Sequence, residues 1–154
     1  MNEKWSYKQS VVLTKICILL FSAAYFGVIF TCPLLTRRFL YYSCGAAGGY
    51  KGTWLFNVTI YTCAVPIGVL LWNLWRLVGD IGLEEIFTGE NIRRLRIISW
   101  MCFAVAFICL LSMTYDFFWG IFAACMVFMG MLIRVIKNTF ERARELKEEV
   151  DYTI

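Results

Sequence analysis

The chain has 154 residues, of which 60% are hydrophobic, 18% are aromatic and only 17% are charged. This composition is too apolar for an ordinary water-soluble domain, and it favours a membrane protein. The net charge is +4, but lysine and arginine beside apolar segments usually report membrane orientation, so direct nucleic-acid binding is disfavoured. Histidine is absent, which removes the commonest general base and metal ligand.

The first apolar segment follows a short polar start. Residues 16–35 carry no charge, and about 20 residues suffice to cross ~30 Å of hydrocarbon at ~1.5 Å per residue. We predict a span at about 12–35, with Lys15 reaching the headgroups. A cleaved signal peptide is the alternative, because it shares the basic start and the apolar run, but Ile29–Cys32 resembles a lipoprotein box only loosely.

The second span is predicted at about 53–76. Residues 37–51 before it are rich in glycine and tyrosine, and we interpret them as the first connection, although Arg37 and Arg38 disfavour a place outside the membrane. Pro66 interrupts the span, and proline removes one backbone hydrogen bond of a helix. We therefore expect a kink near residues 64–68.

A polar interval, residues 83–96, divides the apolar chain into two pairs of spans. Gly79–Gly82 predicts a break, and Thr88 stands where a helix N-cap is expected, with Glu90 in the first turn. The helix that follows has two faces. They are formed by Ile92, Leu95 and Ser99 on one side and by Arg93, Arg94 and Arg96 on the other.

The third and fourth spans are predicted at 97–115 and 117–137, separated by Asp116, which indicates a tight helical hairpin. The tail, 138–154, continues as an amphipathic helix with two i,i+4 ion pairs, Lys137–Glu141 and Arg144–Glu148. We expect its apolar stripe to be buried within the molecule; lipid, another subunit or a soluble partner are the alternatives. The stripe contains Ile136, Phe140, Ala143, Leu146 and Val150.

The distribution of basic residues predicts the orientation. If both termini and the interval Gly79–Arg96 face the cytoplasm, twelve lysines and arginines lie inside and three lie outside, namely Arg37, Arg38 and Lys51. The sequence thus predicts a single all-α membrane domain, 1–154. It is a four-helix bundle of two hairpins joined by a cytoplasmic segment, with both termini in the cytoplasm and the fourth helix extending into it.

Motifs for chemistry are scarce. None of the seven cysteines forms C-x-x-C, and we predict no metal, no cofactor and no enzymatic activity. Cys32 and Cys44 fall near the outer face and could form a disulfide if that face is oxidising. Two pairs of small residues, Ala23 with Gly27 and Gly120 with Ala124, allow close helix packing, and a homo-oligomer is left open.

The central interval and the tail together form a candidate surface for a partner or for lipid. The arginines could hold anionic lipid, at about 1 kcal/mol each, or bind a partner's carboxylate or phosphate through bidentate hydrogen bonds. The surface comprises Phe87, Glu90, Asn91, Arg93, Arg94, Arg96, Phe140 and Leu146.

Two segments carry a family resemblance. Residues 87–96, FTGENIRRLR, and residues 145–154, ELKEEVDYTI, together with four spans, resemble the bacterial membrane family called domain of unknown function 2975. Members are often encoded beside a small helix-turn-helix regulator of the Cro type. The resemblance implies that the cytoplasmic face holds or releases such a transcriptional regulator.

Our leading hypothesis is a non-enzymatic regulatory or sensory anchor in the cell membrane, whose central interval and tail bind a small cytoplasmic partner. The alternative is a transport accessory or peptide-immunity protein, suggested by Asn57, Asn73 and Pro66 within the second span. An intramembrane enzyme has little support without histidine or a buried acidic pair.

Overall fold

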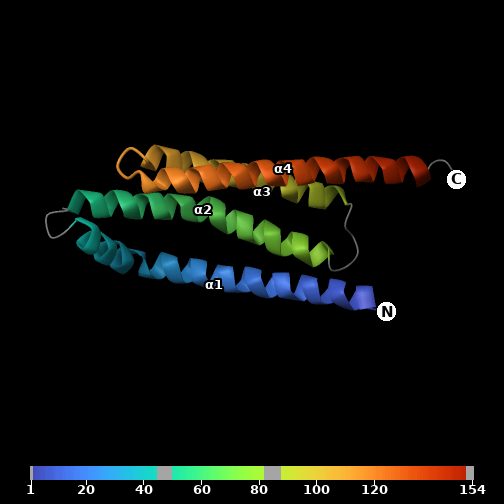
Figure 1. The fold of residues 1–154 in the computed structure, drawn as a ribbon, viewed down its shortest axis with the longest axis horizontal. Coiled ribbons are helices and arrows are strands. Elements are labelled where there is room, and N and C mark those ends of the chain that lie inside the picture. Colours follow the sequence, from blue (N-terminus) through green and yellow to red (C-terminus); the bar gives the residue numbers. More distant parts are fainter. Residues whose placement is uncertain (1, 45–49, 82–87, 152–154) are drawn as a thin grey trace.

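The computed structural model describes residues 2–44, 50–81 and 88–151, and within them the chain is all-α (Figure 1). Consecutive helices run in opposite directions, so α1 begins and α4 ends at the same end of the bundle (Figure 1). The predicted four-helix bundle is confirmed. Its helices are α1 (Asn2–Cys44), α2 (Tyr50–Ile81), α3 (Gly89–Ser112) and α4 (Phe118–Asp151).

Each of these helices contains a stretch that is long and apolar enough to cross a membrane. The protein is therefore a multi-pass membrane protein. In α1, α2 and α4 the helix is longer than the predicted span, because the helical backbone continues into the polar flanks. The four stretches are Gln9–Arg38, Thr53–Ile81, Gly89–Ser112 and Phe118–Val150.

The first predicted connection is too long. The connection predicted at 37–51 is mostly helical, because α1 continues through Pro33 as far as Cys44 and α2 begins at Tyr50; only residues 45–49 lie outside the described part. The end of α2 at Ile81 falls within the break predicted at Gly79–Gly82, although Gly79 itself is still helical and Gly82 is not described. Hydrogen bonds within the helix outweigh the weak helix propensity of Gly79.

Pro66 lies near the middle of the 32 residues of α2. Figure 1 shows that α2 changes direction part way along its length, which agrees with the expected kink. Beside the proline, the Tyr25 hydroxyl of α1 donates a hydrogen bond to the Ala64 carbonyl oxygen over 2.7 Å. Gly68 makes room for this contact, because a Cβ atom there would lie 3.1 Å from the Tyr25 oxygen.

α3 is the most buried helix of the described part and packs on both α2 and α4, while α2 packs on α1 and α3 (Figure 1). Two buried apolar clusters lie along α3 and include side chains of α2 and α4. The first contains Cys63, Val105, Cys109 and Ala123; the second contains Leu77, Leu95, Ile98 and Cys102, with Phe140 of α4 packed against it.

α3 and α4 lie close together at Gly130. The Ser99 hydroxyl donates a hydrogen bond to the Gly130 carbonyl oxygen over 2.9 Å. A Cβ atom at Gly130 would lie 3.2 Å from Phe103 Cζ and 3.3 Å from Cys102 Cβ. Neither predicted pair of small residues provides this contact: Gly27 has open space around it, and Gly120 faces Met113 in the hairpin turn.

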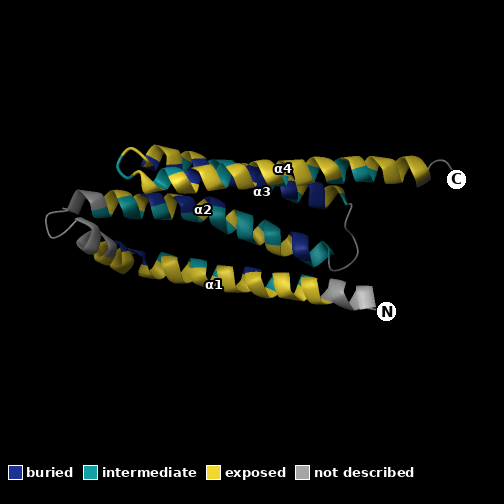
Figure 2. Ribbon diagram, viewed as in Figure 1, coloured by how far each residue is buried: buried dark blue, intermediate teal, exposed yellow. Residues whose placement is uncertain are grey.

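Most described residues of α1 and α4 are exposed (Figure 2), and many of them have large apolar side chains. Phe21 and Phe30 on α1 and Phe122 and Phe128 on α4 are all exposed. In a membrane these side chains contact lipid tails, which are as apolar as leucine. The exposed apolar faces are therefore the lipid-facing faces of the bundle.

A charged cleft between α3 and the end of α4

The start of α3 is set at Thr88. Thr88 has extended backbone angles, φ −86° and ψ 148°, and its carbonyl oxygen accepts hydrogen bonds from the amides of Asn91 and Ile92, at 3.1 and 3.3 Å. The predicted N-cap position is confirmed, but the threonine side chain makes no capping hydrogen bond. Glu90 lies in the first turn, where a negative charge is favoured by the helix dipole.

Two of the predicted surface residues point inward instead. Asn91 is fully buried, and the Arg94 side chain is only 14% exposed. The Arg94 guanidinium pairs with the Asp80 carboxylate at the end of α2, and it also lies 3.5 Å from Asn91 Oδ1 and 3.7 Å from a Glu90 carboxylate oxygen. The expectation that all three arginines lie on the outer side is therefore wrong for Arg94, which joins α3 to α2.

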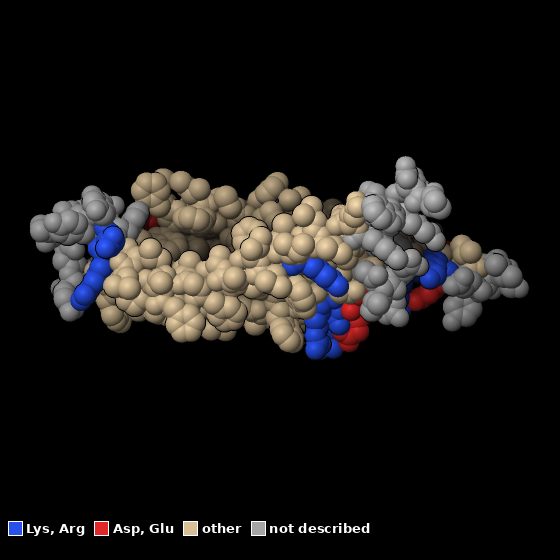
Figure 3. All heavy atoms as spheres, turned by 90° about the horizontal axis from the view of Figure 1, so that it is seen from below, with Lys and Arg blue, Asp and Glu red and all other residues tan. Residues whose placement is uncertain are grey.

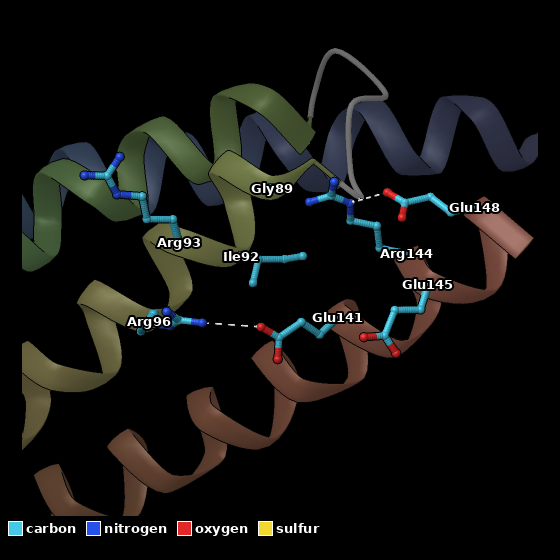
Figure 4. A pocket seen from close by; sticks show the side chains of 8 residues that line it. All are labelled: Gly89, Ile92, Arg93, Arg96, Glu141, Arg144, Glu145 and Glu148. Atoms are coloured by element: carbon cyan, nitrogen blue, oxygen red, sulfur yellow. Dashed lines mark hydrogen bonds and ion pairs between the residues drawn. The ribbon is translucent and has the colours of Figure 1, made fainter.

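The other two arginines line a cleft of about 440 Å³ between the first turns of α3 and the end of α4 (Figure 4). Arg96 Nη2 lies 3.4 Å from Glu141 Oε1, which connects the two walls. On the α4 side, Arg144 Nε donates to Glu148 Oε1 over 2.8 Å. The lining residues are Gly89, Ile92, Arg93, Arg96, Glu141, Arg144, Glu145 and Glu148.

Glu141 is held ionised by its neighbours. Lys137 Nζ lies 2.7 Å from Glu141 Oε2, and this hydrogen bond is the main reason why the pKa of Glu141 lies below its usual value; the charges of Lys137 and Arg96 lower it further. The predicted i,i+4 pairs Lys137–Glu141 and Arg144–Glu148 are both present. Glu141 thus provides a fixed negative charge between two helices.

Arg93 differs from the other arginines of the interval. It is exposed, lines the cleft and forms no ion pair with any described residue. In Figure 4 its side chain extends away from the α4 carboxylates. Its guanidinium therefore presents hydrogen-bond donors that the described part of the chain does not use.

The tail only partly buries its apolar stripe. Phe140 packs against the cluster around Leu77 and Leu95, as expected. Leu146 and Val150 are 62% and 60% exposed, so the expected burial within the molecule fails there. The reason is geometric, because α4 extends beyond the start of α3 and has no neighbouring helix at its end (Figure 1). Phe87 lies outside the described residues.

Both asparagines of α2 have hydrogen-bond partners. Asn73 Nδ2 donates to the Val69 carbonyl oxygen over 2.8 Å, and Asn57 Oδ1 accepts from Cys32 Sγ over 3.4 Å. Sequence reasoning missed the Thr59 hydroxyl, which lies 2.8 Å from Ser112 Oγ and 2.6 Å from the Tyr115 hydroxyl. This hydroxyl cluster joins α2 to the end of α3.

The suggested disulfide between Cys32 and Cys44 is not formed within α1. Cys32 is a free, buried cysteine, and twelve residues of one helix separate it from Cys44, a distance of about 18 Å at ~1.5 Å per residue. A disulfide requires Cα atoms within about 7 Å. Among the described residues, no group of three or more Cys, Asp or Glu side chains could hold a metal ion.

Comparison with known proteins identifies the family. The model of the family described as "Protein of unknown function (DUF2975)" matches residues 47–154, which include all of α2, α3 and α4. No curated protein and no solved structure matched the chain. The match covers more than half of the sequence and includes both segments on which the resemblance depends. The chain therefore belongs to the DUF2975 family of proteins of unknown function.

Proposed function

We propose that this protein is a regulatory anchor in the cell membrane, and that the charged cleft and the exposed end of α4 bind a small soluble protein in the cytoplasm. The observation that carries the proposal is the combination of the Arg93 guanidinium, which pairs with no described residue, and exposed apolar side chains at Leu146 and Val150. In helix-in-groove recognition an amphipathic helix lays its apolar face against an apolar surface, and the exposed Leu146 and Val150 offer such a surface beside the charged cleft.

The orientation that the proposal requires is supported by the basic residues. Twelve of the fifteen lysines and arginines lie on the side of the termini and the central interval, as the positive-inside rule expects of a cytoplasmic side. The family resemblance supports the class of partner, a helix-turn-helix regulator of the Cro type. Such a partner would meet Arg93 with a carboxylate and cover Leu146 with apolar side chains.

Substitutions of exposed cleft residues can test partner binding without disturbing the fold. Arg94 is unsuitable for this test, because its pairing with Asp80 holds α2 and α3 together. Arg93 and Arg96 are exposed and belong to neither core cluster, so reversing their charge changes the cleft and breaks only the exposed Arg96–Glu141 pair. Arg142 and Lys147 are a matched control, because both are exposed on α4 and neither lines the cleft.

The test is photo-cross-linking in cells from a photoreactive residue at position 146, in the full-length chain. Leu146 is better suited than Phe140, because Phe140 is packed against the core. We expect an adduct that mass spectrometry identifies as a small helix-turn-helix protein. It should be lost in the Arg93→Glu, Arg96→Glu variant and retained in the Arg142→Glu, Lys147→Glu variant.

Two results would contradict the proposal. One is an adduct that persists equally in both charge-reversed variants, which would place the partner's contacts outside the cleft. The other is an adduct made only with lipid or with a second copy of the chain. The alternative predicted from Asn57, Asn73 and Pro66, a transport or immunity role, stays a prediction.

A further inference from the structure

A second cavity, of about 540 Å³, lies at the end of the bundle opposite the charged cleft, between α1, α2 and α4. Its two polar side chains have partners within their own segments: Thr36 Oγ1 donates to the Cys32 carbonyl oxygen over 2.8 Å, and Asp116 Oδ1 accepts from the Phe118 amide over 3.0 Å. The other lining residues are apolar or aromatic. They are Leu35, Phe56, Ile60, Phe118, Trp119 and Phe122.

The cavity opens on the surface of the bundle. Leu35, Phe118 and Phe122 are exposed at its opening, and Figure 3 shows a hollow in the apolar surface near one end of the molecule. These residues belong to the membrane-spanning stretches of α1 and α4, so the opening faces lipid tails. Side chains that face an unfilled void lose dispersion contacts. The acyl chain of a neighbouring lipid can enter the cavity from the membrane and restore these contacts.

Basic side chains lie next to this cavity. Arg37 and Arg38 directly follow Thr36 on α1, both are exposed, and neither forms an ion pair with a described residue. Figure 3 shows a basic patch at the same end of the molecule as the hollow. Guanidinium groups bind phosphate oxygens through two parallel hydrogen bonds. Arg37 and Arg38 are two of the three basic residues on the predicted outer side of the membrane, where the positive-inside rule expects few basic residues.

We propose that this cavity and the two arginines form a binding site for one glycerophospholipid. An acyl chain occupies the cavity, and the phosphodiester group binds Arg37 and Arg38 at the membrane surface. Asp116 adds one negative charge to the lining, which favours a phosphodiester with a single charge over a phosphomonoester. The site thus gives a binding role to arginines that the positive-inside rule leaves unexplained.

The experiment is a lipid titration of the full-length protein in detergent micelles, read by native mass spectrometry. The probes are dioleoyl phosphatidylglycerol and dioleoylglycerol, which has the same acyl chains and no phosphate. We expect the phospholipid to bind more tightly by about tenfold or more, as hydrogen bonds to a charged group suggest. Arg37→Gln with Arg38→Gln should remove most of that preference.

Two matched controls accompany the variants. Arg142→Gln with Lys147→Gln removes the same charge at the other end of the protein and should leave phosphatidylglycerol binding unchanged. Ile60→Trp should fill the cavity and weaken binding of both lipids, whereas Ile121→Trp, on the exposed face of α4 outside the cavity, should not. Since the arginine variant changes exposed side chains, the test does not depend on whether Ile60→Trp folds.

The proposal is overturned if phosphatidylglycerol binds equally to the wild-type protein and to the arginine variant. It is also overturned if a folded Ile60→Trp variant binds both lipids as the Ile121→Trp variant does. Equal affinity for the two lipids in the wild-type protein would exclude the phosphate contact. None of these outcomes depends on a soluble partner, so they test the lipid site separately from the proposed function.

Discussion

α1 and α3 have the same mean hydropathy in their most apolar stretches, 2.1, yet 44% of that stretch is buried in α3 and only 11% in α1. Hydropathy thus reports that each helix enters the membrane and says nothing about its place in the bundle. Lipid and protein interior are similarly apolar, so the transfer of a side chain from one to the other gains little.

Small and polar side chains distinguish the two helices. The buried face of α3 includes side chains that let neighbouring backbones approach or that form hydrogen bonds between helices, as at Ser99 and Ser112. In α1, the contacts to α2 depend on few groups, such as Tyr25. The small and polar residues buried in α3 are Asn91, Ser99, Cys102, Ala106, Cys109 and Ser112.

The largest effect should come from widening the contact between α3 and α4. Gly130→Leu places a side chain where a Cβ atom alone lies 3.2 Å from Phe103, and overpacking of this kind costs about 1 to 3 kcal/mol. We expect the free energy of unfolding in mixed micelles to fall by that amount. Gly27→Leu on α1, where the space is open, is the control and should be neutral. An equal loss of unfolding free energy in the two variants would show that α1 and α3 do not differ in how closely they pack.

The next effect should come from the link between the two hairpins. Arg94→Met leaves the Asp80 carboxylate without its partner, and because Asp80 is partly exposed we expect a loss of about 1 to 2 kcal/mol, below that of a fully buried pair. Adding Asp80→Leu should recover part of it in the same unfolding assay. A double variant less stable than Arg94→Met would show that Asp80 has another role.

The smallest effect should be on α1. Tyr25→Phe removes the hydrogen bond to the Ala64 carbonyl oxygen, and such bonds between membrane helices contribute about 0.6 kcal/mol on average. We expect the unfolding free energy to fall by about that amount. A loss as large as that of Gly130→Leu would mean that α1 stabilises the bundle as strongly as α3 does, and the contrast between them would be wrong.

Part of the candidate site could be predicted from the sequence. Thr88, Glu90 and the alternation of apolar and basic residues after them predicted where α3 begins, and the 3.6-residue period predicted that α4 continues to the tail. The partners across the cleft could not be predicted. Arg96 pairs with Glu141, 45 residues later, and Arg94 pairs with Asp80 of another helix. Such pairs depend on how helices are placed side by side, which local periodicity does not contain.

The sequence by itself determined the four membrane helices, the short hairpin at Asp116 and the charged helix beyond the fourth span. These properties follow from the length of apolar stretches and from helical periodicity, which act locally along the chain. Only the tertiary structure decided that α3 is the most buried helix, that the Arg94 side chain points inward while Arg93 is exposed, and that Leu146 stays exposed. The physical reason is that lipid tails and helix faces are nearly equivalent surroundings for an apolar side chain. Close packing at Gly130 and paired polar groups then decide which faces meet.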